Sequence, residues 1–374
     1  MRKLAQLACS VVVLLAAVPS EASAVPDRKV PVTVGVTSVL SGDLGVLGRN
    51  IVDTVETYKK YYSRHDLNFV YEDAKLSSVD GLKAYQSLIN SHKAGFIIGA
   101  CTSNGTMAAK SLINSSRVPT ITVVTGGKNI DAAGPYIFRI GNSDTLNGIQ
   151  EAEAFIAAGT GKAALLTEET EYTQDISEAF RGRFAALGGT LVFDGNFIPG
   201  TVDFRTDITR IKQKSPDAIF MPTQTGTALG VFLKQWNEQG GSRSVSVHTT
   251  FVAAPNPEAH TIAGELIEGV YYMAPRYDRH NPRLKEFFSR YRQDHGRFPP
   301  IAFHTAGTVD SLDLLQKFLD KTGAYSGEGF HDFLLNEVKD YQGLMGTYSF
   351  DPEGNARLGF ELARITKESR ENMQ

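Results

Sequence analysis

Short apolar runs alternate with amphipathic stretches through most of this 374-residue chain. The run at 30–37 carries valine at every second position, and the stretch at 48–62 that follows has the residue spacing of a helix. Strand and helix signals that alternate in this way are typical of parallel sheets, because two parallel strands need a crossover connection that is usually a helix. The sequence therefore predicts an α/β fold with helices on the faces of mainly parallel sheets.

The alternation restarts partway along the chain, which indicates two lobes. One unit spans 30–125 and a second spans 145–274. The region 282–321 has the pattern of long amphipathic helices, and strand signals at 348–350 and 360–366 would have to join sheets formed earlier. We expect three crossings between the lobes, near residues 141–145, 274–277 and 347–352. The predicted lobes comprise residues 25–141 with 276–346, and residues 142–275 with 347–374.

The first residues have the three parts of a secretory signal. Arg2 and Lys3 precede an apolar run at 4–18, and Ala22-Ser23-Ala24 provides a small-x-small cleavage motif. The apolar run is shorter than the roughly 20 residues of a membrane-spanning helix. We expect cleavage of residues 1–24 after Ala24 and an exported mature chain without membrane insertion. A lipoprotein box at Leu7-Ala8-Cys9 is the disfavoured alternative, because it lies inside the apolar run.

The charge balance excludes some classes of partner. The formal net charge is −3, and loss of Arg2, Lys3 and Glu21 with the signal removes two positive charges and one negative charge, which leaves −4. Without a cluster of Lys and Arg, neither nucleic acid nor an anionic membrane surface is an expected partner. Cys9 lies in the predicted signal, so Cys101 would be a lone thiol. The mature chain must then fold without an internal disulfide.

Motifs for cofactors, metals and catalysis are missing from the sequence. Gly42, Gly45 and Gly48 follow the first predicted strand, but each pair is separated by two residues, where a dinucleotide fingerprint needs a pair separated by one. No histidines or cysteines have metal-ligand spacing, and His304 is expected to pack in a helix. No serine has the context of a catalytic triad. We therefore expect no cofactor, no metal, no catalytic residues and no enzymatic activity.

The acidic group Glu168, Glu169 and Glu171 follows a predicted strand and is a weaker candidate for acid–base chemistry. Neighbouring carboxylates repel one another and prefer water. We expect this group to lie in a solvated loop.

A small, hydroxyl-rich segment at 101–106 follows the predicted strand 95–99 and leads into a helix. The free backbone N–H groups and the dipole at a helix start can hold an anion, and Ser103 could add a hydroxyl donor. Capping of the helix by Ser103 is the alternative. The next strand ends at Thr125-Gly126-Gly127, and ligands of open α/β sheets lie outside the carboxyl ends of strands. The two strand ends together predict a carboxylate pocket.

Several short motifs occur along the chain in a recognisable order: Val34-Gly35-Val36, Leu40-Ser41-Gly42, Glu72-Asp73-Ala74, Ile97-Ile98-Gly99, Thr102-Ser103, Phe138-Arg139, Tyr172, Gly269-Val270, Arg276-Tyr277-Asp278 and Tyr348-Ser349-Phe350-Asp351-Pro352-Glu353-Gly354. In this order and spacing the chain resembles the periplasmic binding proteins of the branched-chain amino acid transporter group, which are receptors of ABC import systems. The resemblance covers nearly all of the mature sequence.

The resemblance implies a two-lobed type I periplasmic binding protein, or Venus flytrap, with three hinge crossings, a small-molecule ligand and an ABC transporter permease as partner. It also implies a periplasmic location. The positions that would bind the ligand by analogy are Leu47, Gly48, Thr102, Ser103, Thr125 and Gly127 in the first lobe, and Tyr172, Gln224, Thr225, Thr250 and Phe251 in the second. Among these, Ser103 and the turn 125–127 would hold a ligand carboxylate.

The chain departs from the pattern of this family at two places. Members that bind amino acids usually carry an acid in the loop that here reads His248-Thr249-Thr250-Phe251-Val252. Burying an ammonium group without a partner is costly, so we expect an aromatic or aliphatic carboxylate in place of an ordinary α-amino acid. The common first-lobe disulfide is also missing, with Lys75 about where one cysteine would lie. A branched-chain or other amino acid, and a sensor of an amide or urea-type ligand, are the alternatives.

Overall fold

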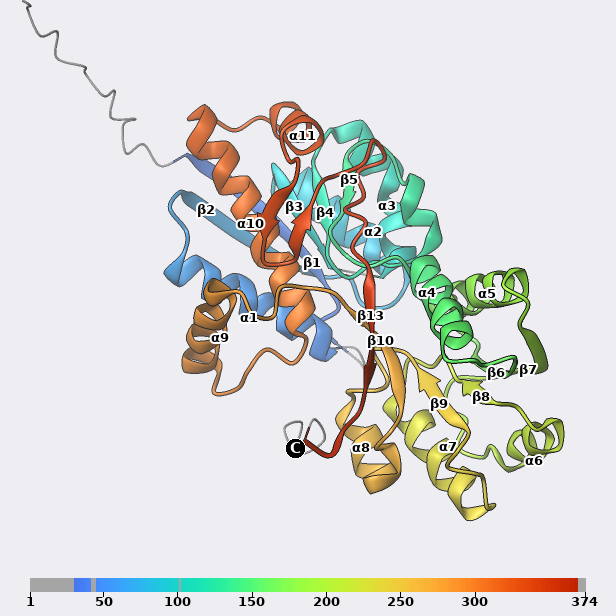
Figure 1. Ribbon diagram of the computed structural model, residues 1–374. Coiled ribbons are helices and arrows are strands. Elements are labelled where there is room, and N and C mark those ends of the chain that lie inside the picture. Colours follow the sequence, from blue (N-terminus) through green and yellow to red (C-terminus); the bar gives the residue numbers. More distant parts are fainter. Residues whose placement is uncertain (1–29, 42–44, 101, 369–374) are drawn as a thin grey trace, which may run out of the picture.

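The computed structural model describes residues 30–41, 45–100 and 102–368. The predicted signal 1–24, its cleavage site and the Cys101 thiol lie outside the described residues. Two lobes lie side by side, each built on its own sheet, and β10 and β13 run together where the lobes join (Figure 1). Among the described residues, no helix is long and apolar enough to span a membrane.

The first lobe contains a parallel sheet in the strand order β2-β1-β3-β4-β5. Its strands are β1 (Pro31–Ser38), β2 (Asp66–Asp73), β3 (Phe96–Ala100), β4 (Thr120–Thr122) and β5 (Ile137–Arg139). The side chains of β3 alternate between two cores, because successive residues of a strand point to opposite faces. Phe96 and Ile98 join one core, and Ile97 joins the other.

Helices cover both faces of this sheet. The face of Phe96 and Ile98 packs against α1 (Gly45–Tyr61), α9 (Pro282–His295), α10 (Ala302–Thr322) and α11 (Gly327–Asn336). The opposite face packs against α2 (Ser78–Gln86), the π-helical turn η1 (Ser87–Ser91) and α3 (Ser103–Ser116). A short 3-10 helix, η2 (Lys128–Ala132), connects β4 to β5.

The second lobe contains a sheet in the order β13-β10-β9-β8-β6-β7, parallel except for β13. Its strands are β6 (Lys162–Glu168), β7 (Thr190–Phe197), β8 (Ala218–Phe220), β9 (Ser246–Thr249), β10 (Tyr271–Pro275) and β13 (Phe360–Arg364). Its helices are α4 (Asp144–Ala157) and α5 (Glu171–Ala186) on one face, with α6 (Arg205–Lys214), α7 (Gly226–Glu238), α8 (Pro257–Ala263) and η3 (Gly264–Ile267) on the other.

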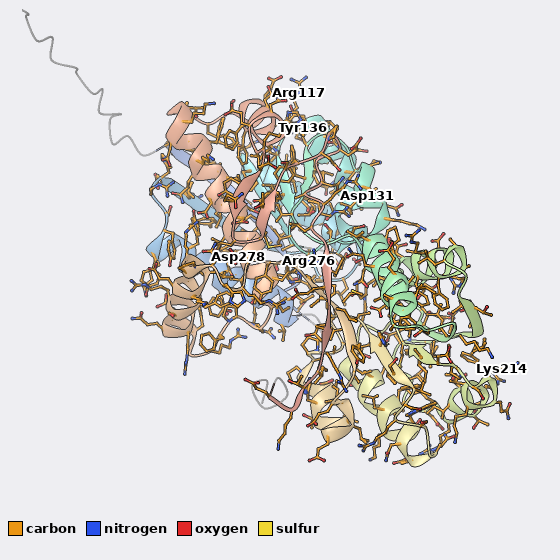
Figure 2. The ribbon with its side chains drawn as sticks, viewed as in Figure 1. Arg117, Asp131, Tyr136, Lys214, Arg276 and Asp278 are labelled. Atoms are coloured by element: carbon orange, nitrogen blue, oxygen red, sulfur yellow. The ribbon has the colours of Figure 1, made fainter. Side chains whose placement is uncertain are left out.

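Three segments connect the lobes. Residues 140–143 lead from β5 to α4, and Arg276 and Asp278 lie where the chain returns from β10 to the first lobe (Figure 2). The third segment differs from the predicted crossing at 347–352. Phe350 and Leu358 pack in the core of the first lobe, and Asn355 pairs with Arg139 of β5.

The chain therefore crosses for the third time just before β13, and the predicted division between 346 and 347 is too early. The predicted strand at 348–350 also differs from the structure. The segments β11 (Tyr341–Gly343) and β12 (Gly346–Tyr348) pair with each other in a separate hairpin and join neither large sheet.

Candidate functional site

The turn after β4 brings the two lobes into contact at the carboxyl ends of their strands. The backbone N–H of Asp144, at the start of α4, donates to the Gly126 carbonyl at 2.8 Å. The backbone N–H of Lys128 donates to Asp175 Oδ2 of α5 at 2.9 Å. The Lys128 ammonium group also donates to Glu178 at 2.6 Å. This interlobe region is the candidate ligand site.

Ser103 and Thr102 have different roles at the start of α3. Thr102 is the N-cap, and its Oγ1 accepts from the Gly105 N–H at 3.2 Å. Ser103 is the first residue of the helix, and its Oγ accepts from the Gly127 N–H at 3.1 Å. The alternative of Ser103 as the cap is therefore wrong. In this bond the Ser103 oxygen accepts, so its hydroxyl hydrogen remains to donate to a ligand.

Two further hydroxyl groups are buried close to these strand ends. Thr125 and Ser38 are 1% exposed, and neither hydroxyl has a hydrogen-bond partner among the described residues. Native structures rarely leave buried polar groups unpaired, because such a group loses its hydrogen bonds to water without replacement. Each of these two hydroxyl groups is therefore a candidate hydrogen-bond donor to a ligand.

Glycines allow close approach at this site. A Cβ at Gly48 would lie 1.9 Å from the Val39 carbonyl oxygen and 3.0 Å from Ser38 Oγ. Only glycine lets α1 begin against the end of β1, with the half-buried Leu47 beside it. A Cβ at Gly127 would lie 3.0 Å from Ser103 Oγ, which explains a second small residue at the predicted pocket.

Aromatic side chains dominate the second-lobe side. Tyr172 lies in the first turn of α5, which Thr170 caps by accepting from the Thr173 N–H. The Tyr172 ring meets Phe251 edge-on at 6.3 Å, and Phe251 contacts Phe360 at 6.2 Å. Burial raises the pKa of the Tyr172 phenol, and the nearby Asp144 carboxyl adds to the shift. The phenol is neutral at physiological pH. Sequence reasoning predicted a strand at 360–366 but missed Phe360 as a site residue, because the strand pattern does not reveal its contact with Phe251.

The other predicted second-lobe residues, Thr250, Thr225 and Gln224, form hydrogen bonds within the loops that follow β8 and β9. The Thr250 hydroxyl donates to the Thr223 carbonyl at 2.6 Å. Thr225 caps α7. The Gln224 backbone N–H donates to Glu168 Oε2 at 2.7 Å, while its side-chain amide forms no hydrogen bond with the described residues. Of these three, Gln224 therefore has its side-chain donors and acceptors available.

Glu168 corrects the prediction of a solvated acidic loop. Its side chain is completely buried at the end of β6, where Oε2 accepts from Thr223 Oγ1 at 2.8 Å as well as from Gln224. These two donors replace water and make burial of the carboxylate tolerable. Its other oxygen, Oε1, has no partner among the described residues. Glu169 is exposed, as predicted.

Asp144 is a second acid that sequence reasoning missed. Its side chain is 4% exposed, and a Cβ at Gly126 would lie 2.2 Å from its Oδ1. Burial raises the pKa of Asp144 well above its usual range, and the charge of Arg139 opposes this shift. No motif in the sequence indicates such an environment.

His304 packs in α10 as predicted. It is buried, and burial lowers the pKa of its imidazole to about 4. Within the described ranges, no group of three acidic, histidine or cysteine side chains could hold a metal ion.

Known proteins similar to this chain have the same two-lobed fold. A family model described as periplasmic binding protein matches residues 31–369. The Leu/Ile/Val-binding protein homolog 6 of Brucella abortus (strain 2308) is 22% identical over 345 residues, which cover 90% of this chain and 85% of the relative.

Two solved structures resemble the chain over most of its length. The branched-chain amino acid transporter substrate binding protein LivJ of Streptococcus pneumoniae, in complex with isoleucine, has a TM-score of 0.76 and 21% identity, covering 91% of this chain and 97% of that one. A solute binding protein of an ABC transporter from Rhodopseudomonas palustris BisB5, in complex with 3,4-dihydroxybenzoic acid, has a TM-score of 0.77 and 24% identity, covering 90% and 93%. The chain belongs to the periplasmic binding protein family and has the type I fold of ABC transporter receptors.

Proposed function

We propose that this chain is the exported, periplasmic solute-binding component of an ABC importer and that it captures a small organic carboxylate between its lobes. The observation that carries the proposal is the buried Thr125 hydroxyl without a partner, beside a turn that is hydrogen-bonded to Ser103. The hydroxyl groups of Thr125, Ser103 and Ser38 would donate to the ligand oxygens. An ABC permease would receive the ligand.

The second-lobe aromatic residues support an apolar ligand body. Tyr172, Phe251 and Phe360 form a continuous set of ring contacts. Rings of this kind pack against an aromatic or branched aliphatic group with favourable offset or edge-to-face geometry. The dihydroxybenzoate bound by the Rhodopseudomonas relative has this combination of carboxylate and ring.

Capture would follow the hinge motion of a two-lobed receptor. The ligand docks on the first lobe through its carboxylate, and the second lobe rotates about the three connecting segments. Contacts that exist only in the closed state stabilise closure. The proposal includes no chemical step, and the residues named here bind and enclose the ligand.

An amino acid is the second candidate, and one observation favours it. Glu168 Oε1 is buried without a partner, so it could accept from an ammonium group. The 248–252 loop offers no acid at the family's usual position, which favours the amine-free carboxylate.

Isothermal titration of the mature chain against benzoate, 4-hydroxybenzoate, 4-methylpentanoate, leucine and benzamide tests the proposal. We expect at least one amine-free acid to bind and benzamide to bind more weakly than benzoate. 4-Methylpentanoate matches leucine without its amino group, so the pair isolates the contribution of the amine. Tight binding of leucine with no response to the acids would contradict the proposed ligand class.

A further inference from the structure

The carboxyl group of Asp144 lies against the turn that is proposed to hold the ligand. Asp144 is the first residue of α4 after the Ser143 cap, and its backbone is fixed to Gly126 by the 2.8 Å hydrogen bond. Its carboxyl oxygens lie within 2.2 to 2.8 Å of where a Gly126 side chain would begin. Gly126 stands between Thr125 and Gly127, so a ligand carboxylate bound at these residues would lie next to the Asp144 carboxyl.

The Asp144 carboxyl forms no hydrogen bond or ion pair with the described residues, although its side chain is only 4% exposed. The Arg139 guanidinium group is bonded to Asp131, which lies in the first lobe (Figure 2). The Lys128 ammonium group is paired with Glu178 and lies 3.6 Å from Asp175. Lys128 is therefore engaged by other carboxylates, whereas Arg139 bonds Asp131 through Nη2 only and its buried Nη1 has no hydrogen-bond partner among the described residues.

The electrostatic surroundings of Asp144 are mostly negative. The charged and titratable groups that face it from the packed elements are Arg139 of β5, Asp131 of η2, and Glu171, Tyr172 and Asp175 of α5. The positive end of the α4 dipole favours an ionised carboxyl, but it acts weakly. Burial raises the pKa of Asp144, and the charge of Arg139 offsets this only in part. A neutral carboxyl is the form that these surroundings favour.

We propose that Asp144 is a ligand-contacting, specificity-determining residue that donates a hydrogen bond to the ligand carboxylate as a neutral acid. The inference rests on the proposed function, because it requires a carboxylate at Thr125 and Gly127. Two ionised carboxylates in contact in a buried site repel strongly, so such a pair retains one proton. The proton stays on Asp144 and is shared with the ligand oxygen. A neutral Asp144 also offers no counter-charge to an ammonium group, which selects against amino acids.

A neutral Asp144 in the complex makes ligand affinity depend on pH, and the affinity should decrease as pH rises. The ligand anion raises the pKa of Asp144 further, so the complex holds more protons than the free protein. Affinity should be constant at low pH and should fall by up to about tenfold per pH unit above the pKa of Asp144 in the free protein.

Titration of the intact mature chain with benzoate, or with the tightest-binding acid of the panel, at several values from about pH 5.5 to about pH 9 tests the inference. We expect Kd to rise with pH, and buffers of different ionisation enthalpy to report uptake of protons at high pH. Asp144→Asn should bind within about threefold of the wild-type affinity at low pH and lose the dependence on pH, because an amide donates but does not titrate. Glu238→Gln removes an exposed carboxylate at the end of α7, whose nearest cation is Arg205 inside the second lobe, and should keep the wild-type slope.

Binding by the wild-type protein that is independent of pH would overturn the inference, as would an unchanged slope in Asp144→Asn. Affinity that rises with pH and is lost in Asp144→Asn would also overturn it, because Asp144 would then act as an anion toward a ligand cation. Failure of every acid at every pH would instead reject the proposed function, and the inference with it. The wild-type profile decides the question even if the variant does not fold.

Discussion

The Ser103 hydroxyl oxygen accepts a hydrogen bond from the Gly127 backbone N–H at 3.1 Å. This bond ties the start of α3 to the turn after β4, so two strand ends of the first lobe act as one unit. Ser103 thereby positions Gly127, and its hydroxyl can still donate one hydrogen bond to another acceptor.

Ser103→Ala should weaken the binding of a carboxylate ligand by about 5- to 150-fold, because it removes a half-buried hydroxyl that the bound ligand would bury, a donor worth about 1–3 kcal/mol. Titration calorimetry with the best-binding acid measures this loss. Ser115→Ala is the matched control in the same helix, since the exposed Ser115 hydroxyl donates only to the Leu112 carbonyl. Equal affinities of Ser103→Ala and the wild type would show that Ser103 only positions the turn.

Asp175 of the second lobe accepts a hydrogen bond from the Lys128 N–H of the first lobe. Substitutions of Asp175 should therefore shift the unliganded protein toward a state in which the lobes lie farther apart. Asp175→Ala removes the acceptor for the Lys128 N–H, whereas Asp175→Asn keeps an oxygen acceptor and loses only the charge. We expect a larger radius of gyration by small-angle scattering and weaker binding in the alanine variant, with a smaller change in the asparagine variant. Arg181→Ala is the control, because Arg181 of α5 pairs with Asp194 inside the second lobe. If all three variants had the same radius of gyration as the wild type, the contact of Asp175 with Lys128 would not hold the lobes together.

Much of the fold follows from local patterns in the sequence. The predicted strand 95–99 matches β3 within one residue at each end, and the helix predicted to follow it is α3. The short helix α8 begins at Pro257 after the Asn256 cap, but two helical turns give little periodicity to detect. The third crossing was misplaced because β12 pairs with β11, a partner that the strand pattern at 348–350 does not reveal.

The burial of Glu168 and Asp144 could not be predicted from the sequence. Repulsion among the Glu168 group predicts solvation only if no donors are near, yet Thr223 donates to Glu168 from 55 residues away. The charged groups around Asp144 likewise come from three separate elements, β5 and η2 of the first lobe and α5 of the second. The sequence therefore predicts hydroxyl-rich strand ends. It does not predict which distant groups surround a buried acid, because these come together only in the tertiary structure.

Gly48→Ala should destabilise the protein by about 3 kcal/mol, because the added methyl group would meet the Val39 carbonyl at 1.9 Å and the backbone must move. Chemical denaturation measures the change. Gly182→Ala is the control, since Gly182 is an exposed position of α5 with open space around it. That substitution should stabilise the protein by about 0.5–1 kcal/mol through helix propensity. A Gly48→Ala protein as stable as the wild type would show that α1 can shift without cost.

His304 should make the protein less stable in acid. Burial lowers the pKa of His304 from its ordinary value of 6.5 to about 4, so the unfolded chain binds a proton there more readily than the folded protein does. Above about pH 6.5, His304 is neutral in both the folded and the unfolded chain and does not reduce the free energy of unfolding. As pH falls toward about 4, protonation of His304 in the unfolded chain lowers the free energy of unfolding by at most about 3 kcal/mol. Urea denaturation across this range should show a shallower decline for His304→Leu. His280→Leu, which replaces an exposed histidine, should keep the wild-type decline. If both variants lost stability as steeply as the wild type, the acid sensitivity would have to come from other groups.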